Sequence, residues 1–463
     1  MKTSLTNNLS SSSEKMSGEW RVLNPAQSDQ VIGTCGFRYS DVDAIVSLSS
    51  ASVLALSLLS AKQRWSLLKQ AREILIQHQE EFIQLAMLEL GRTREDLSQE
   101  WSQIERYLGA FFRDESIHLT GEARGVTAII GSYVWPLFYS LQFVFSNFLV
   151  GNAVILKPSE KSTLTVHRVF EVLRAELKEL SAVQVLVGDR EIGRRLACHE
   201  GVSTVIFQGS FEVGMRVRQD TMSQPAKEVL LFLGAKNPAV VFDGADSACV
   251  KEILRDAFQG TGQDCQSVSI VLVEKSRLDS FLIELHEAAK SFKIGSPESG
   301  AWMGPLIDGA MLDRYLKFIG ISEREGAEIL MRGKLLPALG RGHFVTPTLA
   351  VFRSLSPEQM RKSVSLQTEI LSPHLSVISF QGIDELKAIM EKMSHGSLCT
   401  LWGEGNQMRE LARDIPFSKV VVNGSSLQFD PWVSTHSRKR SGNHGLLGVG
   451  LLAQLTRKRV IQG

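Results

Sequence analysis

The sequence has almost no excess of charge of either sign. It contains 51 Lys and Arg against 50 Asp and Glu in 463 residues, so its formal net charge is +1. Broad basic surfaces, which bind nucleic acid and anionic membranes, require a marked excess of Lys and Arg. We therefore expect neither nucleic acid nor a membrane surface among the partners of this protein.

Cysteine is scarce and scattered. The chain has five cysteines, namely Cys35, Cys198, Cys249, Cys265 and Cys399. Their number is odd and no two form a Cys-x-x-Cys pair, which excludes a disulfide framework and a structural zinc site, so no metal centre is predicted. Unpaired thiols suit a reducing compartment, and a cytoplasmic location is expected.

Long hydrophobic runs are also missing. The most apolar stretch, residues 136–156, is interrupted by polar residues such as Gln142 and Asn147. A membrane-spanning helix needs about 20 predominantly apolar residues, so this stretch predicts a buried helix that runs into a strand. Residues 1–17 are polar and rich in Ser and Asn, which argues against a signal peptide and predicts a flexible tail.

The rest of the chain has an ordinary globular composition, with 43% hydrophobic and 22% charged residues. Residues 19–50 predict strands or an extended entry, and apolar spacing predicts helices over 61–112. Strands are predicted at 126–130, 153–156, 183–187, 202–207, 239–242, 268–273, 375–380, 398–402 and 419–422. Helices are predicted at 166–177, 191–199, 246–259, 278–291, 383–393 and 406–414. This alternation is typical of βαβ units with parallel sheets, so the predicted class is α/β.

Two segments at strand ends have the chemistry of a nucleotide site. Lys157 and Glu160 follow the strand 153–156, at the edge where open α/β sheets bind ligands. Gly209, Ser210 and Gly214 follow another strand and open a helix, whose N-terminus offers free N–H groups and a positive dipole to a phosphate. Each segment by itself is also explained as an ordinary turn.

One cysteine stands in a setting that suits a nucleophile. Cys265 follows the Gly-rich sequence 260–262 and precedes a predicted strand, which favours an accessible, reactive thiol. The other four cysteines are interpreted as small core residues. The neighbouring Asp264 is expected to disfavour the thiolate and to raise the pKa of the Cys265 thiol.

Taken in order, these segments resemble the aldehyde dehydrogenase superfamily. The resemblance rests on residues 153–160, 207–214, 231–238 and 262–265, and it continues through 303–306, 347–348, 369–373 and 422–423. The ending Ser441-Gly442-Asn443-His444 is most similar to the succinylglutamate semialdehyde dehydrogenase branch. The resemblance implies an aldehyde dehydrogenase fold. A Rossmann-like NAD-binding domain (18–230) would precede an α/β catalytic domain (231–418) and a C-terminal segment (419–463) that returns and bridges them.

The resemblance also implies a reaction. The thiol of Cys265 would attack an aldehyde or semialdehyde, hydride would pass to NAD(P), and water would hydrolyse the thioester to a carboxylic acid. Cofactor-binding positions of the family are matched by Lys157, Glu160, Gly209, Ser210, Gly214 and Glu369. Glu369 would hold the nicotinamide ribose, and Glu160 favours NAD over NADP because a carboxylate repels a 2′-phosphate. A homodimer is expected, although residues 115–125 are shorter than the family's subunit-pairing hairpin.

Three places depart from the family pattern. Phe232 stands where the motif LELGGK carries the general-base glutamate, and it cannot take a proton. Val134 replaces the asparagine that donates to the developing oxyanion, a contribution of roughly 2.7–4 kcal/mol. Residues 434–440 are basic where relatives have a glycine loop, and we interpret them as a solvated loop from which Arg438 or Arg440 can pair with a substrate carboxylate. Activity is therefore expected to be impaired.

Three functions stay open at this point. The first is an aldehyde dehydrogenase that takes its base from elsewhere, with Glu212 or His374 in that role. The second is an acylating dehydrogenase, in which a thiol such as coenzyme A resolves the thioester. Such relatives also lack the base and share a segment like residues 234–237. The third is a catalytically inactive relative that binds a cofactor or a partner protein.

Overall fold

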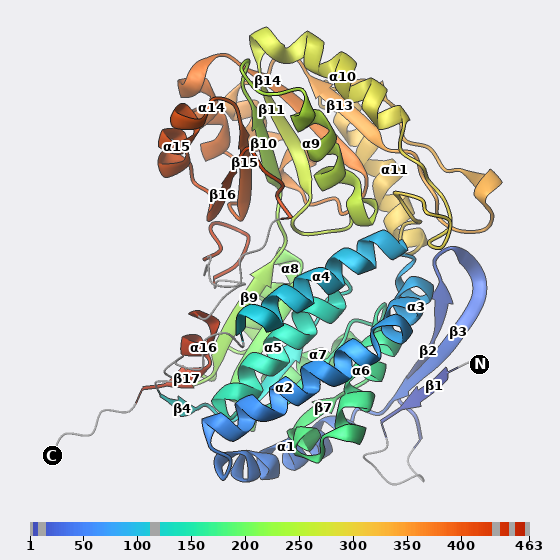
Figure 1. Ribbon diagram of the computed structural model, residues 1–463, viewed down its shortest axis with the longest axis vertical. Coiled ribbons are helices and arrows are strands. Elements are labelled where there is room, and N and C mark those ends of the chain that lie inside the picture. The colour runs from blue at the N-terminus through green and yellow to red at the C-terminus, as the bar shows by residue number, and fades with distance from the viewer. Residues whose placement is uncertain (1–2, 8–14, 112–120, 428–435, 444–449, 459–463) are drawn as a thin grey trace, which may run out of the picture.

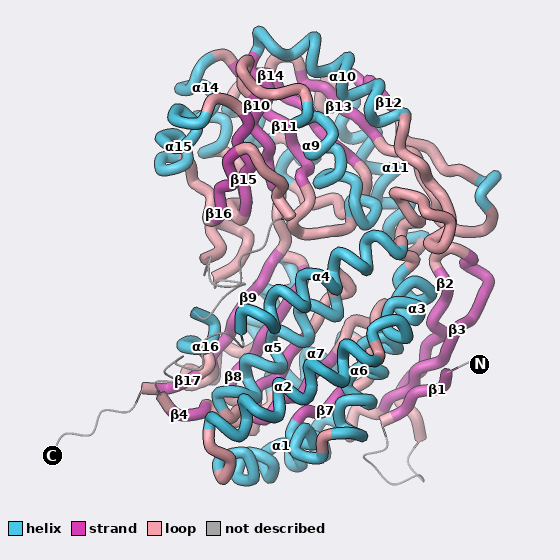
Figure 2. Tube along the Cα trace, in the orientation of Figure 1, coloured by secondary structure: helices cyan, strands magenta, loops and turns pink. Residues whose placement is uncertain are grey.

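The computed structural model describes residues 3–7, 15–111, 121–427, 436–443 and 450–458. Two β-sheets, each covered by helices, make up its lower and upper halves (Figure 1). Loops, pink in Figure 2, gather where the two halves meet. The structure is thus an α/β fold with parallel sheets, as the alternating pattern predicts.

The lower half is built on a five-stranded parallel sheet in the order β7–β6–β5–β8–β9. Its strands are β5 (Val126–Ile130), β6 (Ala153–Lys157), β7 (Val183–Val185), β8 (Thr204–Gly209) and β9 (Glu228–Leu233). Its helices are α1 (Asp41–Ser57), α2 (Ala61–Gln77), α3 (Gln79–Leu90), α4 (Arg94–Phe111), α5 (Pro136–Val150), α6 (Thr163–Glu176), α7 (Arg190–Cys198) and α8 (Phe211–Asp220).

Alternating residues of this sheet enter two separate cores, because successive side chains of a strand point to opposite faces. On β6, Val154 and Leu156 belong to the core that includes α5, whereas Ile155 belongs to the core that includes α1 and α7. Every residue of α5 is buried, which explains its mainly apolar composition, and its few polar side chains are buried with the rest. The apolar stretch 136–156 is therefore a core helix and strand.

The upper half is built on a seven-stranded sheet in the order β12–β13–β14–β11–β10–β15–β16, in which β12 alone runs antiparallel to its neighbour. Its strands are β10 (Asn237–Val241), β11 (Val268–Glu274), β12 (Glu328–Met331), β13 (Thr348–Phe352), β14 (His374–Phe380), β15 (Leu398–Trp402) and β16 (Lys419–Val422). Its helices are α9 (Ala248–Phe258), α10 (Leu278–Lys290), α11 (Gly309–Arg324), α12 (Pro357–Lys362), α13 (Val364–Gln367), α14 (Gly382–Glu391) and α15 (Gly405–Asp414).

The N-terminal region differs from the prediction in two places. Residues 3–7 were expected in a flexible tail, but β1 (Thr3–Thr6) pairs with β3 (Gln27–Phe37), which also pairs with β2 (Gly18–Asn24). Asn7 is buried and hydrogen-bonded to Asp41 and to the main chain of Val187, so long-range contacts order a locally featureless segment. Residues 41–50 are predicted to be strand or extended chain but belong to the helix α1, whose many serines obscure the helical spacing of its buried residues.

The crossing from one half to the other lies later than predicted. A boundary between residues 230 and 231 falls inside β9, which pairs with β8 along its whole length. The chain leaves the first sheet after Leu233 and enters the second at Asn237. The buried run of β9 continues almost directly into the buried β10, so the sequence alone offers no visible break between the two sheets.

The C-terminal part of the chain returns to the first sheet. Leu231 and Leu233 hydrogen-bond with residues 441–443, which run antiparallel beside β9. Gly442 has φ +126°, and a Cβ there would lie 2.1 Å from the Leu231 carbonyl oxygen, so only glycine fits this approach. Beyond it, α16 (Gly450–Gln454) packs on α5, and β17 (Thr456–Arg457) pairs with β4 (Glu122–Ala123).

In the part of the chain that the structure describes, no single helix is long and apolar enough to cross a membrane. Helices α1 and α2 reach that length and composition only when taken together across a bend of 115°. The shortened segment predicted in place of a subunit-pairing hairpin, residues 115–125, lies mostly outside the described residues.

Candidate active site

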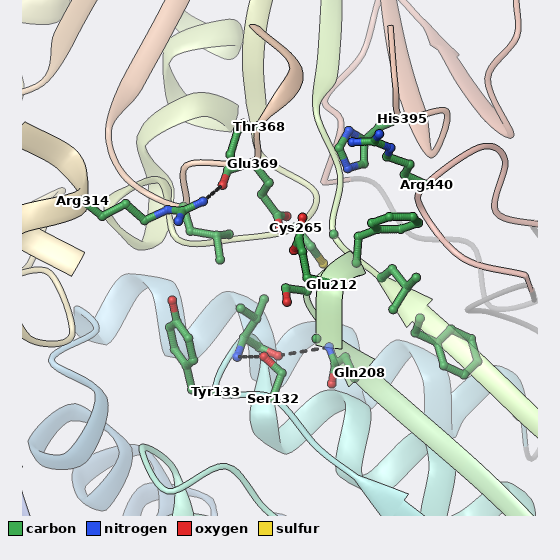
Figure 3. A pocket seen from close by; sticks show the side chains of 18 of the residues that line it. Ser132, Tyr133, Gln208, Glu212, Cys265, Arg314, Thr368, Glu369, His395 and Arg440 are labelled. Atoms are coloured by element: carbon green, nitrogen blue, oxygen red, sulfur yellow. Dashed lines mark hydrogen bonds between the residues drawn. The ribbon is translucent and has the colours of Figure 1, made fainter. Parts of the chain in front are cut away.

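A cavity of about 460 Å³ lies where the two halves meet, and Cys265 opens into it (Figure 3). Its walls come from loop 132–134, the end of β8, the end of β9, loop 367–371 and Arg440. A neighbouring cavity of about 670 Å³ lies along the first sheet. The two cavities have five lining residues in common, namely Ser132, Tyr133, Gln208, Gly209 and Ser210. A single extended ligand can therefore occupy both.

The loop before Cys265 is held in an unusual backbone conformation. Gly260, Thr261 and Gly262 all have positive φ values, between 57° and 65°. A Cβ at Gly262 would lie 2.6 Å from the Ser372 carbonyl oxygen, so the loop presses against segment 370–373. A non-glycine residue in this conformation is strained and needs surrounding contacts to hold it. For Thr261, one such contact is the hydrogen bond from its hydroxyl to the Gly304 carbonyl oxygen. The glycines thus position the thiol rather than merely loosen the chain.

The Cys265 thiol is half-buried in surroundings that disfavour its ionised form. Burial is the largest cause that raises the pKa of this thiol, followed by the negative charges of Asp264 and Glu369. The predicted effect of Asp264 is therefore confirmed in direction. The Tyr139 hydroxyl lies 3.8 Å from Sγ and acts in the opposite sense.

The position of the family's general base is filled by an aromatic ring. Phe232 is 2% exposed, and its ring centroid lies 4.9 Å from that of Phe143 on α5. Phe143 also stacks on Tyr139, with 6.0 Å between the two ring centroids, so the three rings form a row. Phe232 nevertheless contributes to the cavity wall beside Cys265. This wall supplies apolar surface and no proton acceptor.

The position of the oxyanion donor is equally apolar. Val134 is buried and lines the cavity, with its main-chain N–H donated to the Ser132 hydroxyl at 3.1 Å. The following helix α5 is anchored by Glu100, whose carboxylate accepts the N–H groups of Leu137 and Phe138 at 2.9 and 3.0 Å. Position 134 therefore has a fixed backbone and lacks a side-chain donor.

Glu369 extends into the cavity toward Cys265 (Figure 3). Its carboxylate accepts the N–H of Ala235 at 2.9 Å and lies so close to Gly234 that a Cβ there would be 2.0 Å from Oε2. Burial raises the pKa of this carboxyl to about 7, against the opposing charges of Arg314 and Lys236. The carboxyl thus changes its charge near neutral pH.

The two residues predicted as substitute bases, Glu212 and His374, occupy different surroundings. Glu212 is exposed and lines the cavity with Cys265, so it has access to the site. His374 is buried away from that cavity, where its Nε2 lies 3.1 Å from the Ser322 hydroxyl. Burial lowers the pKa of His374 to about 3, so it is neutral. Its prediction as a substitute base is wrong, because β14 directs it into the interior of the second half.

The larger cavity contains most of the residues predicted for the cofactor. Lys157 is 3% exposed at the end of β6, and its Nζ donates to Glu160 at 3.2 Å and to the Pro158 carbonyl at 3.1 Å. Both residues line this cavity with apolar groups such as Val213. A cation, a carboxylate and apolar walls fit the ribose and adenine half of a dinucleotide.

The Gly-Ser segment divides into lining and packing residues. Gly209 and Ser210 line both cavities, and Ser210 begins α8 with its hydroxyl accepting the N–H of Val213 at 3.4 Å. Gly214 lies outside both cavities. A Cβ there would be 2.4 Å from a methyl group of Leu233, so Gly214 allows α8 to approach β9 closely.

Among the described residues 436–440 of the basic segment, all are exposed, as predicted, except the half-buried Ser437. Two of its cationic side chains nevertheless contact other parts of the protein. The Lys439 amine donates to the carbonyl oxygens of Met390, Glu391 and Met393. Arg440 lines the cavity of Cys265, with its guanidinium 5.1 Å from the Phe211 ring centroid. Lys439 therefore differs from the predicted solvated residue, whereas the position of Arg440 is compatible with the predicted pairing with a substrate carboxylate.

Sequence reasoning missed two residues that contact the nucleophile or its partner. Tyr139 belongs to an apolar helix and Gln266 follows Cys265, and neither stands in a recognisable motif. Their hydrogen bond joins positions 127 residues apart, which only the packing of α5 against the cysteine loop produces. Among the described residues, no group of three or more metal-ligating side chains is present.

Comparison with known proteins gives a consistent picture. The family model described as the aldehyde dehydrogenase family matches residues 12–461. An α-ketoglutaric semialdehyde dehydrogenase of Bacillus subtilis (strain 168) is 26% identical over 460 residues, covering 93% of each chain. A 2,5-dioxopentanoate dehydrogenase of Saccharolobus solfataricus is 28% identical, covering 82% of this chain and 81% of its own.

A solved structure shows the same fold. A mutant aldehyde dehydrogenase C from Pseudomonas syringae, in complex with NAD+ and octanal, superposes with a TM-score of 0.88 at 23% identity. The match covers 95% of this chain and 92% of that protein.

Proposed function

The chain belongs to the aldehyde dehydrogenase family, and on that premise we propose that it oxidises an aldehyde or semialdehyde through Cys265 with NAD as the hydride acceptor. The observation that carries the proposal is the continuity of the two cavities. The thiol of Cys265 opens into a space that shares Gly209 and Ser210 with the cavity of Lys157 and Glu160. A bound dinucleotide thus reaches the nucleophile.

The cofactor would be held mainly by the first sheet. Lys157 and Glu160 would take the adenosine ribose, and the start of α8 at Ser210 would take the diphosphate. When bound, NAD supplies the acceptor for hydride. The Glu160 carboxylate supports NAD over NADP, because it would repel a 2′-phosphate.

The residues of this chain carry the covalent step. The Cys265 sulfur would form a bond to the aldehyde carbon, giving a thiohemiacetal. Loss of hydride to the nicotinamide and of the hydroxyl proton to water would leave a thioester on the same sulfur. Val134 offers no side-chain hydrogen bond to the aldehyde oxygen, so this step would be slow compared with an enzyme that has the donor. Losing one such donor typically costs about 10²–10³-fold in rate.

Release of the acid needs a group that takes a proton from water, and we assign that role to Glu369. Its carboxylate shares the cavity with the thioester, and its pKa of about 7 suits a base near neutral pH. Water would lose a proton to the carboxylate, bond to the acyl carbon and displace the sulfur, which then takes that proton. The resemblance implies that Glu369 also holds the nicotinamide ribose. The two roles are compatible because hydrolysis comes after hydride transfer, when the ribose contact is no longer needed.

A second candidate is transfer of the acyl group to a thiol. It is favoured by the packing of Phe232 on Phe143, which places an apolar ring where a water-activating carboxylate would stand. A thiolate such as that of coenzyme A attacks a thioester without a general base. This candidate shares every step up to the thioester.

The substrate class that we propose is a semialdehyde with a remote carboxylate. Both relatives named above act, by their names, on semialdehydes of dicarboxylic acids. Arg440 brings a guanidinium into the cavity of Cys265, where it can pair with a carboxylate. Arg314 also lines the cavity, but its guanidinium donates to the carbonyl oxygens of Glu369 and Ile370.

The test is a rapid-mixing measurement of NADH formation with NAD and a panel of aldehydes and semialdehydes. The enzyme concentration is set high enough for one equivalent of NADH to be detected. We expect a burst close to one equivalent followed by a slow steady rate. Coenzyme A that raises only the steady rate would establish acyl transfer. A flat trace with every aldehyde, from folded protein that binds NAD, would overturn the proposal and indicate an inactive relative.

A further inference from the structure

The Cys265 thiol has a hydroxyl neighbour that no motif contains. The Tyr139 hydroxyl lies 3.8 Å from Sγ, within hydrogen-bonding distance for sulfur. Tyr139 stands in the first turn of α5 and is 1% exposed. A buried phenol needs a hydrogen-bond partner, and here one of its partners is the proposed nucleophile.

The hydroxyl is oriented by a second group. The side-chain amide of Gln266 donates to the Tyr139 oxygen at 3.4 Å. A thiolate can accept hydrogen bonds but cannot donate them, so the phenolic hydrogen is left to point at sulfur once Cys265 is ionised. A donor that itself accepts a hydrogen bond is strengthened by it. The two hydrogen bonds therefore point the same way, from Gln266 to Tyr139 and from Tyr139 to the Cys265 sulfur.

The surroundings show why such a donor is needed. The groups that face Sγ include Asp264 on its own loop, Glu369 from the second half and Tyr139 from α5. Both carboxylates and burial raise the pKa of the thiol, whereas the hydrogen bond from Tyr139 lowers it. Burial also raises the pKa of Tyr139, which keeps the phenol protonated and able to donate.

The Tyr139 ring is held in place independently of its hydroxyl. It contacts the Phe138 ring edge-on at 5.1 Å and stacks on Phe143 at 6.0 Å. A phenylalanine at this position keeps these ring contacts. The change Tyr139→Phe therefore removes one oxygen atom beside the sulfur and leaves the packing of α5 intact.

We propose that Tyr139, oriented by Gln266, donates its hydroxyl hydrogen to the Cys265 thiolate and so positions and stabilises the nucleophile. The inference rests on the proposed function in taking Cys265 as the nucleophile. It extends that function by naming a buried positioning residue beside a cavity that has Phe232 and Val134 at the positions which the resemblance assigns to the base and the oxyanion donor.

The experiment measures alkylation of individual cysteines by iodoacetamide, using peptide mass spectrometry and no cofactor or aldehyde. Because a hydrogen bond to a charged group contributes about 1.5 kcal/mol or more, Tyr139→Phe should slow the alkylation of Cys265 about 10-fold at fixed pH. Gln266→Leu should slow it by a smaller factor, roughly 3-fold. Cys198, which is half-buried and bonded to the Asp220 carbonyl, serves as an internal reference whose rate stays unchanged.

The matched control is Tyr107→Phe. Tyr107 is also buried against α5, and its hydroxyl lies 3.0 Å from that of Ser146, so this variant loses a buried phenol oxygen from the same core. It should leave Cys265 alkylation unchanged. Equal alkylation rates of Cys265 in Tyr139→Phe and the parent protein, with Cys198 unchanged in both, would overturn the inference.

The NADH burst separates this inference from the proposed function. A parent protein with no burst, but with slowed alkylation in Tyr139→Phe, would sink the proposed function and leave the role of Tyr139 standing. A normal burst in the parent protein with unchanged alkylation in Tyr139→Phe would support the proposed function and overturn the role of Tyr139. If both hold, the burst rate of Tyr139→Phe should also fall about 10-fold, in line with the smaller thiolate fraction.

Discussion

The two cavities of this protein differ in how much of the family chemistry they keep. In the larger one, Lys157 and Glu160 form an ion pair at a strand end, with the start of α8 close by. In the smaller one, Phe232 and Val134 replace two polar side chains with apolar ones, although Cys265 stays in place. The difference indicates that the proposed cofactor binding and the proposed catalysis can be changed separately, because different loops carry the residues for each.

The apolar substitutions also form a packed unit. The Phe232 ring packs against Phe143 at a tilt, and Phe143 stacks on Tyr139, whose hydroxyl lies 3.8 Å from the Cys265 sulfur. A charged residue at either phenylalanine position would enter this row without a partner and would cost stability. The wall of the Cys265 cavity is therefore well packed at these positions, and Cys265, Glu369 and Glu212 are among the polar groups that line it.

The largest effect should follow removal of the sulfur. Cys265→Ala is expected to abolish the NADH burst, because loss of a covalent nucleophile has cost on the order of 10⁶-fold in well-studied enzymes. Binding of NAD, followed by tryptophan fluorescence, should stay unchanged because the cofactor cavity is intact. Cys198→Ser is the matched control and should keep the burst. Any burst in Cys265→Ala would move the chemistry to another group.

The next largest effect concerns release of the acid. Glu369→Gln should leave the acyl adduct on Cys265, visible by intact-mass spectrometry, and lower the steady rate by roughly 10²–10⁴-fold. Since the carboxyl has a pKa of about 7, it is protonated and inactive as a base below that pH and ionised above it. The steady rate of the parent protein should therefore rise as the pH increases through 7.

A contrary result is easily recognised. If Glu369→Gln lowers NAD affinity and burst rate together but leaves the pH profile unchanged, the residue holds the ribose and is not the base. If Glu212→Gln instead removes the rise near pH 7, the exposed carboxylate of the same cavity takes the proton.

Polar side chains at positions 134 and 232 should make the Cys265 cavity as similar to the family pattern as the larger cavity is. Val134→Asn with Phe232→Glu is expected to raise the burst rate by about 10²-fold through the new oxyanion donor. The midpoint of thermal unfolding should fall, since the new carboxylate is buried beside Phe143. Phe232→Leu with Val134→Asn is the control for the added carboxylate. A folded, NAD-binding double variant without any gain would contradict the assignment of position 134.

The smallest effect is expected in the cofactor cavity. Lys157→Met should weaken NAD binding about 10-fold, because it removes a charge-assisted hydrogen bond partner of Glu160 and of the ribose. Titration calorimetry of folded protein would measure the change. Lys161→Met, whose amine pairs with Asp308 outside this cavity, serves as the control. Equal losses in both variants would show that the Lys157 cation is not a specific contact.

Much of the fold could be predicted because local patterns and tertiary structure agree. The strands at 126–130, 268–273 and 398–402 and most helices between strands lie where apolar periodicity places them. The failures occur where long-range contacts decide. The strand β1 exists through its pairing with β3, and β9 belongs to the first sheet through its pairing with β8. Neither pairing leaves a local signal.

The sequence by itself determined the family, the position of Cys265 and the absence of a base at 232 and of an amide at 134. Each of these depends on the residue present at a known place in an ordered set of motifs. The tertiary structure alone decided that Gly214 packs against β9, that His374 is turned away from the cavity, and that Arg440 reaches into it. It also brought Tyr139 to Cys265, because the direction of a side chain and the meeting of distant segments are set by packing between elements.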